Sequence, residues 1–137
     1  MKTLIGGCMC GEVRFEIKNE ALVSLLCHCK DCQKLSGSAF TSGVVFPKDS
    51  IFYEKKNTSS YEYSGGSGAK MTRTFCKTCG TPIATVVAGL GDLCVVALVA
   101  FDDASQCPAP SVSVQMNNAK PWVTLADSVT KHQFGMS

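Results

Sequence analysis

Seven of the nine cysteines lie in three short clusters whose spacing is typical of zinc ligands. The clusters are Cys8-Met9-Cys10, Cys27-His28-Cys29-Lys30-Asp31-Cys32 and Cys76-Lys77-Thr78-Cys79. Two pairs of cysteines can supply the four thiolates of a closed tetrahedral site, whereas a triplet leaves one coordination position open. Closed zinc sites stabilise folds, and sites with an open position can do chemistry. The sequence therefore predicts one site of each kind.

The first predicted site is a structural zinc ion held by Cys8, Cys10, Cys76 and Cys79. Residues two apart in an extended backbone point to the same side, so two thiols of the first pair can face the metal while Met9 points away. In the turn that ends at Gly80, two thiolates can converge and backbone amides can point at the sulfurs. The metal would join the N-terminal strand to the middle of the chain. The alternative is two separate redox dithiols, although no thioredoxin-like βαβ pattern surrounds Cys76.

The second predicted site is a zinc ion with an open position, held by Cys27, Cys29 and Cys32. Alternation places the first two thiols on one face and His28 on the other, so we expect His28 to support the site rather than to bind the metal. Cys32 follows at the start of a short helix, where Lys30 and the helix N-terminus favour thiolates. Water, an external thiol or a substrate oxygen can then take the fourth position.

A fourth protein ligand would instead close the second site and make it structural. The candidates are Cys107, Cys94, His28 and His132. Cys107 precedes a proline in a loop and is the best placed of them. Cys94 lies in an apolar run and is expected in the core. The spacing favours none of the four.

The elements that must position these cysteines are predicted to be mostly short β-strands. Val13, Phe15 and Ile17 alternate with charged residues, which indicates a half-buried strand. Further strands are expected over residues 21–26, 40–46, 51–54, 61–63, 71–75, 85–88, 93–101, 112–116 and 122–125. Glycine-rich segments at 65–68 and 89–92 predict hairpin turns. One short helix is expected over residues 30–36, closed by Gly37.

The composition is that of an ordinary globular protein. A chain of 137 residues with 45% hydrophobic and 18% charged residues predicts one domain and argues against disorder. The net charge of +2 is too small to indicate nucleic acid or a membrane surface as a partner. No signal peptide is recognisable, and the nearest apolar run, residues 93–101, is about half the roughly 18 residues of a membrane span. We therefore expect a cytoplasmic protein whose cysteines are metal ligands rather than disulfides.

Three segments resemble the glutathione-dependent formaldehyde-activating enzyme family, which includes centromere protein V. They are GCMCGEVRF at 7–15, CHCKDCQKLSGSAF at 27–40 and RTFCKTCGTP at 73–82, and their order and separation also fit. The resemblance implies that residues 1–137 form a single zinc-binding β-tent domain of short antiparallel strands with one short helix and two zinc ions. It also implies that the four-cysteine site is structural and that Cys27, Cys29 and Cys32 hold the catalytic zinc.

The function that this resemblance implies is a zinc-dependent carbon–sulfur lyase acting on small thiol adducts, similar to S-(hydroxymethyl)glutathione synthase. Its expected partners are glutathione or a similar small thiol and an aldehyde such as formaldehyde, with no nucleic acid and no membrane. The oligomeric state is left open. Two other classes compete with this interpretation: a non-enzymatic zinc-stabilised binding module, and a metal-handling or redox protein with a reactive Cys94 or Cys107.

Side chains near the triplet are candidates for the substrate pocket. Segment 37–40 should line the pocket, and Ser38 could donate a hydrogen bond to substrate, although an ordinary loop role is the alternative. Phe40 and Trp122 could form an apolar wall or pack in the core. Arg73 could pair with a substrate carboxylate or be a solvated strand residue.

Overall fold

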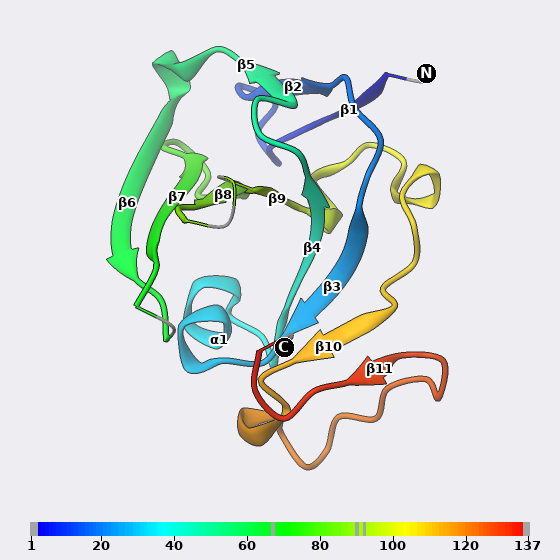
Figure 1. The fold of residues 1–137 in the computed structure, drawn as a ribbon. Coiled ribbons are helices and arrows are strands. Elements are labelled where there is room, and N and C mark those ends of the chain that lie inside the picture. The colour runs from blue at the N-terminus through cyan, green and yellow to red at the C-terminus, as the bar shows by residue number, and fades with distance from the viewer. Residues whose placement is uncertain (1–2, 67, 90, 92, 136–137) are drawn as a thin grey trace.

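The computed structural model describes residues 3–66, 68–89, 91 and 93–135 (Figure 1). The described chain is mostly β, as predicted. The strands are β1 (Leu4–Gly7), β2 (Arg14–Ile17), β3 (Val23–Cys27), β4 (Thr41–Phe46), β5 (Ile51–Tyr53), β6 (Thr58–Ser64), β7 (Lys70–Cys76), β8 (Pro82–Val87), β9 (Leu93–Ala97), β10 (Val112–Val114) and β11 (Thr130–Lys131). The α-helix is α1 (Lys30–Ser36), and short 3₁₀ turns are η1 (Lys55–Asn57), η2 (Leu98–Ala100), η3 (Ala104–Gln106) and η4 (Met116–Asn118).

The strands form two sheets. The smaller has the order β1-β2-β5, and the larger has the order β11-β10-β3-β4-β9-β8-β7-β6. Antiparallel pairing, which was predicted throughout, holds for most neighbours, but β10 runs parallel to both β3 and β11. The long connection from β9 through η2 and η3 brings β10 back in the direction of β3, which is the kind of crossover that parallel pairing requires.

The larger sheet has one face in the core and one face turned toward α1. The period of two is clear in β9, where Cys94 and Val96 are buried and Leu93, Val95 and Ala97 on the other face are half-buried. The core lies where the buried face meets the smaller sheet, and there the rings of Phe15 and Phe101 meet edge to face at 5.3 Å. Figure 1 shows the larger sheet curving around α1, which lies between the β6–β7 hairpin and the ends of β3 and β4.

The helix forms where the sequence predicts it. Cys29 is the N-cap, and its sulfur accepts a hydrogen bond from the backbone N–H of Cys32. At the other end, Gly37 adopts a left-handed conformation with φ 64°, which a glycine accepts without strain. The first predicted hairpin turn also forms, since Gly65 N–H donates to the carbonyl of Ala69 at 2.9 Å. Ser67 of that turn, and Leu90 and Asp92 of the second one, lie outside the described residues.

Several predicted strand limits were wrong, each for a local reason. The strand expected at 122–125 is a loop, because Pro121 has no N–H and Val123 N–H closes a turn onto Lys120 at 3.0 Å. The strand expected over 93–101 ends at Ala97, where η2 turns the chain toward the core. Similarly, β10 ends at Val114 because Gln115 has a left-handed φ of 58°. Strands β1 and β11 were not predicted.

No helix within the described residues is long and apolar enough to cross a membrane.

Candidate metal centres

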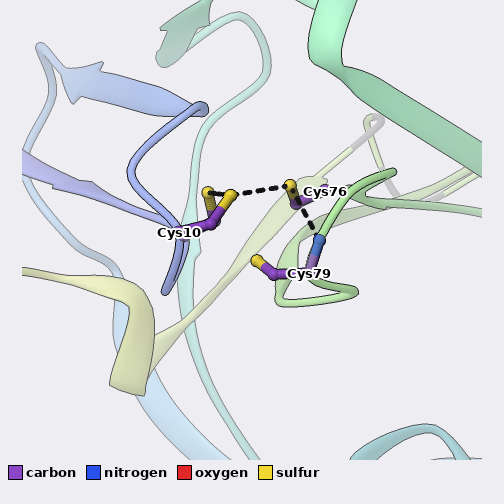
Figure 2. Close-up of side chains that lie close together, drawn as sticks. Cys10, Cys76 and Cys79 are labelled. Carbon is purple, nitrogen blue, oxygen red and sulfur yellow. Dashed lines mark hydrogen bonds between the residues drawn. The ribbon is translucent and has the colours of Figure 1, made fainter.

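Four thiols from opposite ends of the chain's first two thirds converge beside the smaller sheet. The sulfurs of Cys8, Cys10, Cys76 and Cys79 all lie within 4.8 Å of one another. Figure 2 shows the Cys10 sulfur facing those of Cys76 and Cys79 across a narrow gap. The Cys8 and Cys10 sulfurs are 3.5 Å apart, and the Cys10 and Cys76 sulfurs are 3.7 Å apart. Met9 points away, with 84% of its surface exposed. The extended backbone expected for Cys8-Met9-Cys10 was wrong, since these residues form a turn closed by Gly11 N–H, which donates to the Cys8 carbonyl at 3.1 Å.

Backbone amides are directed at these sulfurs. The N–H groups of Thr78 and Cys79 both donate to the Cys76 sulfur at 3.4 Å, and Val13 N–H donates to the Cys8 sulfur at 3.2 Å. A hydrogen bond with the Thr81 hydroxyl lowers the pKa of the Cys79 thiol to about 5. The turn closes through Gly80, whose φ of 79° is left-handed. These contacts favour the thiolate form that a metal requires.

The four sulfurs fit a zinc ion. A tetrahedron with zinc–sulfur bonds of about 2.3 Å has sulfur–sulfur edges of about 3.8 Å. The two sulfur–sulfur distances given above are within a few tenths of an ångström of that edge. Four thiols without carboxylates are also the donor set that selects zinc over magnesium or calcium. The four-cysteine cluster can therefore bind a metal ion with all four positions filled by protein.

The second group of thiols, which we call the three-cysteine cluster, is built at the junction of β3 and α1. Cys27 ends β3, Cys29 caps the helix, and Cys32 lies in its first turn. Their sulfurs lie within 4.8 Å of one another. Hydrogen bonds from the Cys27 and Cys32 thiols lower the pKa of Cys29 to about 2. The same contact with Cys29 raises the pKa of Cys27 to about 11. The cluster thus favours one thiolate even before a metal neutralises it.

Residues behind the three-cysteine cluster hold its backbone in place. Gln33 donates from its side-chain amide to the carbonyl of His28 at 2.7 Å and to the carbonyl of Asn118 at 3.0 Å. His28 is buried, its Nε2 lies 2.9 Å from the Ser113 hydroxyl, and burial lowers its pKa. Its ring also contacts Phe40 at 5.1 Å. His28 therefore lies behind the cluster, on the face opposite the thiols.

None of the four candidates for a fourth ligand joins this cluster. Among the described histidines, cysteines and acidic residues, no other donor atom lies within 4.8 Å of all three sulfurs. Cys94 and Cys107 are buried in the core, and burial raises the pKa of both thiols, that of Cys94 to about 11. Neither is a ready nucleophile or ligand in that state. The three donors that remain leave one position of a tetrahedral metal free for an external group.

A large cavity opens beside the three-cysteine cluster. It has a volume of about 700 Å³, and Cys32 forms part of its wall. Most of the remaining wall is apolar and comes from the α1-facing side of β3, β4, β8 and β9. A second, more polar cavity of about 380 Å³ lies next to it, lined by Asp31, Lys34, Leu35, Tyr61, Tyr63, Ser64 and Arg73. Three of these residues, Leu35, Tyr63 and Arg73, line both cavities.

Only some of the pocket residues expected from sequence line the large cavity. Ser38 and Phe40 line the large cavity, whereas Gly37 and Ala39 are not among its lining residues. Trp122 is 72% exposed and belongs neither to the lining of these two cavities nor to the core. Arg73, which was left open between substrate pairing and solvation, reaches both cavities.

Two groups of pocket residues were missed. Tyr63 was predicted only as part of a strand, and burial raises its pKa to about 12. The apolar wall was missed as well, although a signal for it exists. The run in β9 is apolar on both faces, which indicates a second covered or pocket-forming face.

Known proteins provide an independent comparison. No curated protein matches the chain. Among solved structures, a crystal structure of a Rhodobacter sphaeroides protein matches with a TM-score of 0.59 and 19% identity, over 78% of this chain and 98% of the other. At that identity, the match supports the fold alone. The family model described as glutathione-dependent formaldehyde-activating enzyme matches residues 3–118, a range that includes both cysteine clusters. The chain therefore belongs to the family of glutathione-dependent formaldehyde-activating enzymes.

Proposed function

We propose that the protein is a zinc-dependent carbon–sulfur lyase that joins a small thiol such as glutathione to an aldehyde and cleaves the resulting adduct. In this proposal, Cys8, Cys10, Cys76 and Cys79 hold a structural zinc ion, and Cys27, Cys29 and Cys32 hold a catalytic one. Family membership supports glutathione and formaldehyde chemistry. The two cysteine clusters supply the ligands.

One observation carries the proposal. The three-cysteine cluster has three donors and no fourth among the described residues, and one of its cysteines faces a large cavity. A closed structural site has neither an open position nor access for a small molecule. The arrangement is that of a metal site to which a substrate can come.

The chain's residues can bind and orient both reactants. When bound, a zinc ion at Cys27, Cys29 and Cys32 would lower the pKa of an incoming thiol or polarise the aldehyde oxygen. Tyr63 is protonated at neutral pH, as an ordinary tyrosine is, and burial raises its pKa further to about 12, so its hydroxyl can donate to an oxygen in the cavity. Arg73 supplies a positive charge at the boundary between the two cavities for a carboxylate of the thiol.

The reaction is an addition, and its balance is simple. The thiol sulfur forms a bond to the carbonyl carbon as the carbon–oxygen π bond breaks. The carbonyl oxygen takes up one proton, which replaces the proton lost by the thiol. Nothing is oxidised or reduced, and no other co-reactant is needed. The reverse reaction breaks the same carbon–sulfur bond, which defines the enzyme as a lyase.

Carbon-13 exchange spectroscopy tests this proposal, because the uncatalysed addition is reversible and its rate can be measured without protein. The zinc-loaded protein should accelerate exchange between formaldehyde and its glutathione adduct. Cys29→Ser should remove that acceleration. Cys107→Ser, which removes a buried thiol outside both clusters, should keep it. Absence of acceleration by the zinc-loaded wild type would refute the enzyme proposal and favour the alternative, a zinc-stabilised binding module.

Two further assignments accompany the proposed reaction. All nine cysteines lie among the described residues and all are free, which supports a reducing compartment such as the cytoplasm. The two sheets of the described chain enclose one core, which supports residues 1–137 as a single zinc-binding β-tent domain.

A further inference from the structure

The cavity beside Cys32 is far larger than formaldehyde. Formaldehyde has two heavy atoms and occupies roughly 60 Å³, twice the share of a water molecule in the liquid. The cavity has about 700 Å³, which is in the range of pockets for ligands of drug size. A substrate pair in which formaldehyde is the electrophile would leave most of this volume unused.

The wall of the large cavity is suited to hydrocarbon. Its described lining includes Leu22, Val23, Leu25, Val45, Val87, Leu93, Val95 and Val99. Period-two alternation turns Leu25 and Val95 toward the cavity, on the face of β3 and β9 opposite the core. Among the described lining residues Arg73 is the only charged one. Such a wall stabilises an apolar group and offers few partners to the amides and carboxylates of glutathione itself.

The polar part of the site is the smaller cavity, which shares Leu35, Tyr63 and Arg73 with the large one. The smaller cavity carries Asp31, Lys34 and Arg73, which are suited to the carboxylates and the ammonium group of a peptide thiol. Arg73 Nε is buried without a hydrogen-bond partner, and the guanidinium lies over the Phe75 ring at 5.1 Å. No acidic residue within the described chain forms an ion pair with Arg73. This charge is therefore available to an anionic ligand.

We propose that the site takes adducts between an anionic peptide thiol and an aldehyde that carries an apolar chain of several carbons. The thiol's polar groups occupy the smaller cavity, its sulfur lies at the three-cysteine cluster, and the aldehyde's hydrocarbon chain fills the large cavity. This inference rests on the proposed lyase function and names the class of its electrophile.

The chemical step is unchanged by the longer aldehyde. The sulfur bonds to the carbonyl carbon, the carbon–oxygen π bond breaks, and the oxygen takes up one proton in place of the proton lost by the thiol, to give an S-(1-hydroxyalkyl) thioether. The bond-making centre stays beside Cys32, and only the substituent on the carbonyl carbon differs. Chain length should therefore act through binding in the large cavity.

Stable thioethers test the inference without requiring turnover. S-methyl-, S-butyl- and S-hexylglutathione should bind the zinc-loaded protein with affinities that rise about threefold to fourfold per methylene, as expected for burial of each group in an apolar pocket. The same trend should appear in kcat/KM for butanal and hexanal with glutathione, since these two aldehydes have the same carbonyl environment and differ in chain length alone. A flat affinity series would overturn the inference.

Neighbouring residues on one strand provide matched variants. Val87 lines the large cavity, whereas Val86 is exposed and is not among its lining residues. Val87→Asn should reduce the gain from S-methyl- to S-hexylglutathione at least tenfold, and the milder Val87→Thr should reduce it less. Val86→Asn should leave the gain unchanged. Equal series in all four proteins would show that the chain does not enter the cavity.

Variants of Arg73 on β7 test where the charged groups of the thiol bind. Arg73→Gln should weaken binding of every S-alkylglutathione about tenfold or more, since hydrogen bonds to charged groups have large effects. Arg73→Lys should restore part of that loss. Lys70→Gln alters a cation on the same strand that lines neither cavity and pairs with Glu62, and it should have no effect. Equal affinities for Arg73→Gln and Lys70→Gln would contradict the assigned position of the thiol's polar groups.

Failure of this inference differs from failure of the proposed function. Acceleration with formaldehyde together with a flat thioether series would keep the lyase and refute the apolar electrophile. A dimer in sedimentation that excludes all the thioethers would show that a second copy covers the cavity, and would also refute it. Loss of activity with every aldehyde would refute the lyase and this inference together.

Discussion

The side-chain amide of Gln33 donates a hydrogen bond to the carbonyl oxygen of His28 at 2.7 Å. His28 lies between Cys27 and Cys29 in the sequence, so this bond fixes the backbone that carries both thiols, and the same amide also reaches the carbonyl of Asn118. Gln33→Glu keeps the size of the side chain but places a carboxylate against two carbonyl oxygens. Supporting contacts of this kind typically change metal affinity by about 10–100-fold. We therefore expect Gln33→Glu to weaken zinc binding at the three-cysteine cluster by about 10–100-fold, as measured by competition with a chelator.

Ser36→Ala is the control for Gln33→Glu, since Ser36 lies at the other end of the same helix. Its hydroxyl donates to the carbonyl of Gln33 at 3.4 Å and accepts from Ser38 N–H at 3.2 Å. The zinc affinity of Ser36→Ala should match that of the wild type. A wild-type zinc affinity in Gln33→Glu would show that Gln33 does not orient the cluster.

The two cysteine clusters should respond differently to loss of a ligand. Cys76 is buried in the core, and its sulfur contacts Cys10 and two backbone amides, so Cys76→Ser should destabilise the fold severely. Cys29→Ser should lower activity about 100-fold or more and change the melting temperature little. Thermal melts in the presence of zinc, compared with Cys107→Ser, measure the difference. Equal collapse of both ligand variants would indicate two structural metals.

Close packing at Gly6 predicts a strong effect of a single methyl group. A Cβ at Gly6 would lie 2.3 Å from the carbonyl oxygen of Ala100 and 2.8 Å from Cα of Phe101, and these backbone atoms cannot yield easily. Gly6→Ala should reduce the free energy of unfolding by about 1–3 kcal/mol or more. Urea denaturation measures it, with Gly66→Ala as the control because nothing lies within 4 Å of a Cβ there. Equal midpoints would contradict the close approach of β1 to η2.

A surface ion pair predicts a pH dependence. Arg14 donates to both carboxylate oxygens of Asp102, one of them at 3.0 Å, and these bonds lower the pKa of Asp102. A carboxyl with a lowered folded pKa stabilises the fold above its unfolded pKa of about 3.9, and this stabilisation is lost as the pH falls through the folded pKa. The melting temperatures of wild type and Asp102→Asn should therefore differ by a constant amount between pH 8 and pH 5. A difference that already shrinks between pH 7 and pH 5 would refute the lowered pKa.

Local signals predicted much of this fold and of both cysteine groups. Cys29 and Gly37 mark the ends of α1 because capping is decided by adjacent residues. The Cys-x-Cys and Cys-x-x-Cys spacings predicted two groups of thiols because cysteines two or three residues apart stay close in space, and the structure brings the seven thiols into the same two groups.

Long-range contacts decided what the sequence did not reveal. β11 has only two residues, and its parallel pairing with β10 depends on a loop that no local pattern specifies. The 122–125 segment is an exception, because a local turn between Lys120 and Val123 keeps this segment, which has the composition of a strand, out of both sheets. The large cavity depends on the curvature of the sheet around α1, which arises from many strands together.

The central claim is that the three-cysteine cluster holds a metal with an open position for a thiol. The visible spectrum of the cobalt-substituted protein tests it most directly, since cobalt absorption reports thiolate number and coordination geometry. Titration with glutathione should change the bands of the second site while both metals stay bound, and Cys29→Ser should abolish that change. Unchanged bands, with four protein ligands at each of two sites, would contradict the claim.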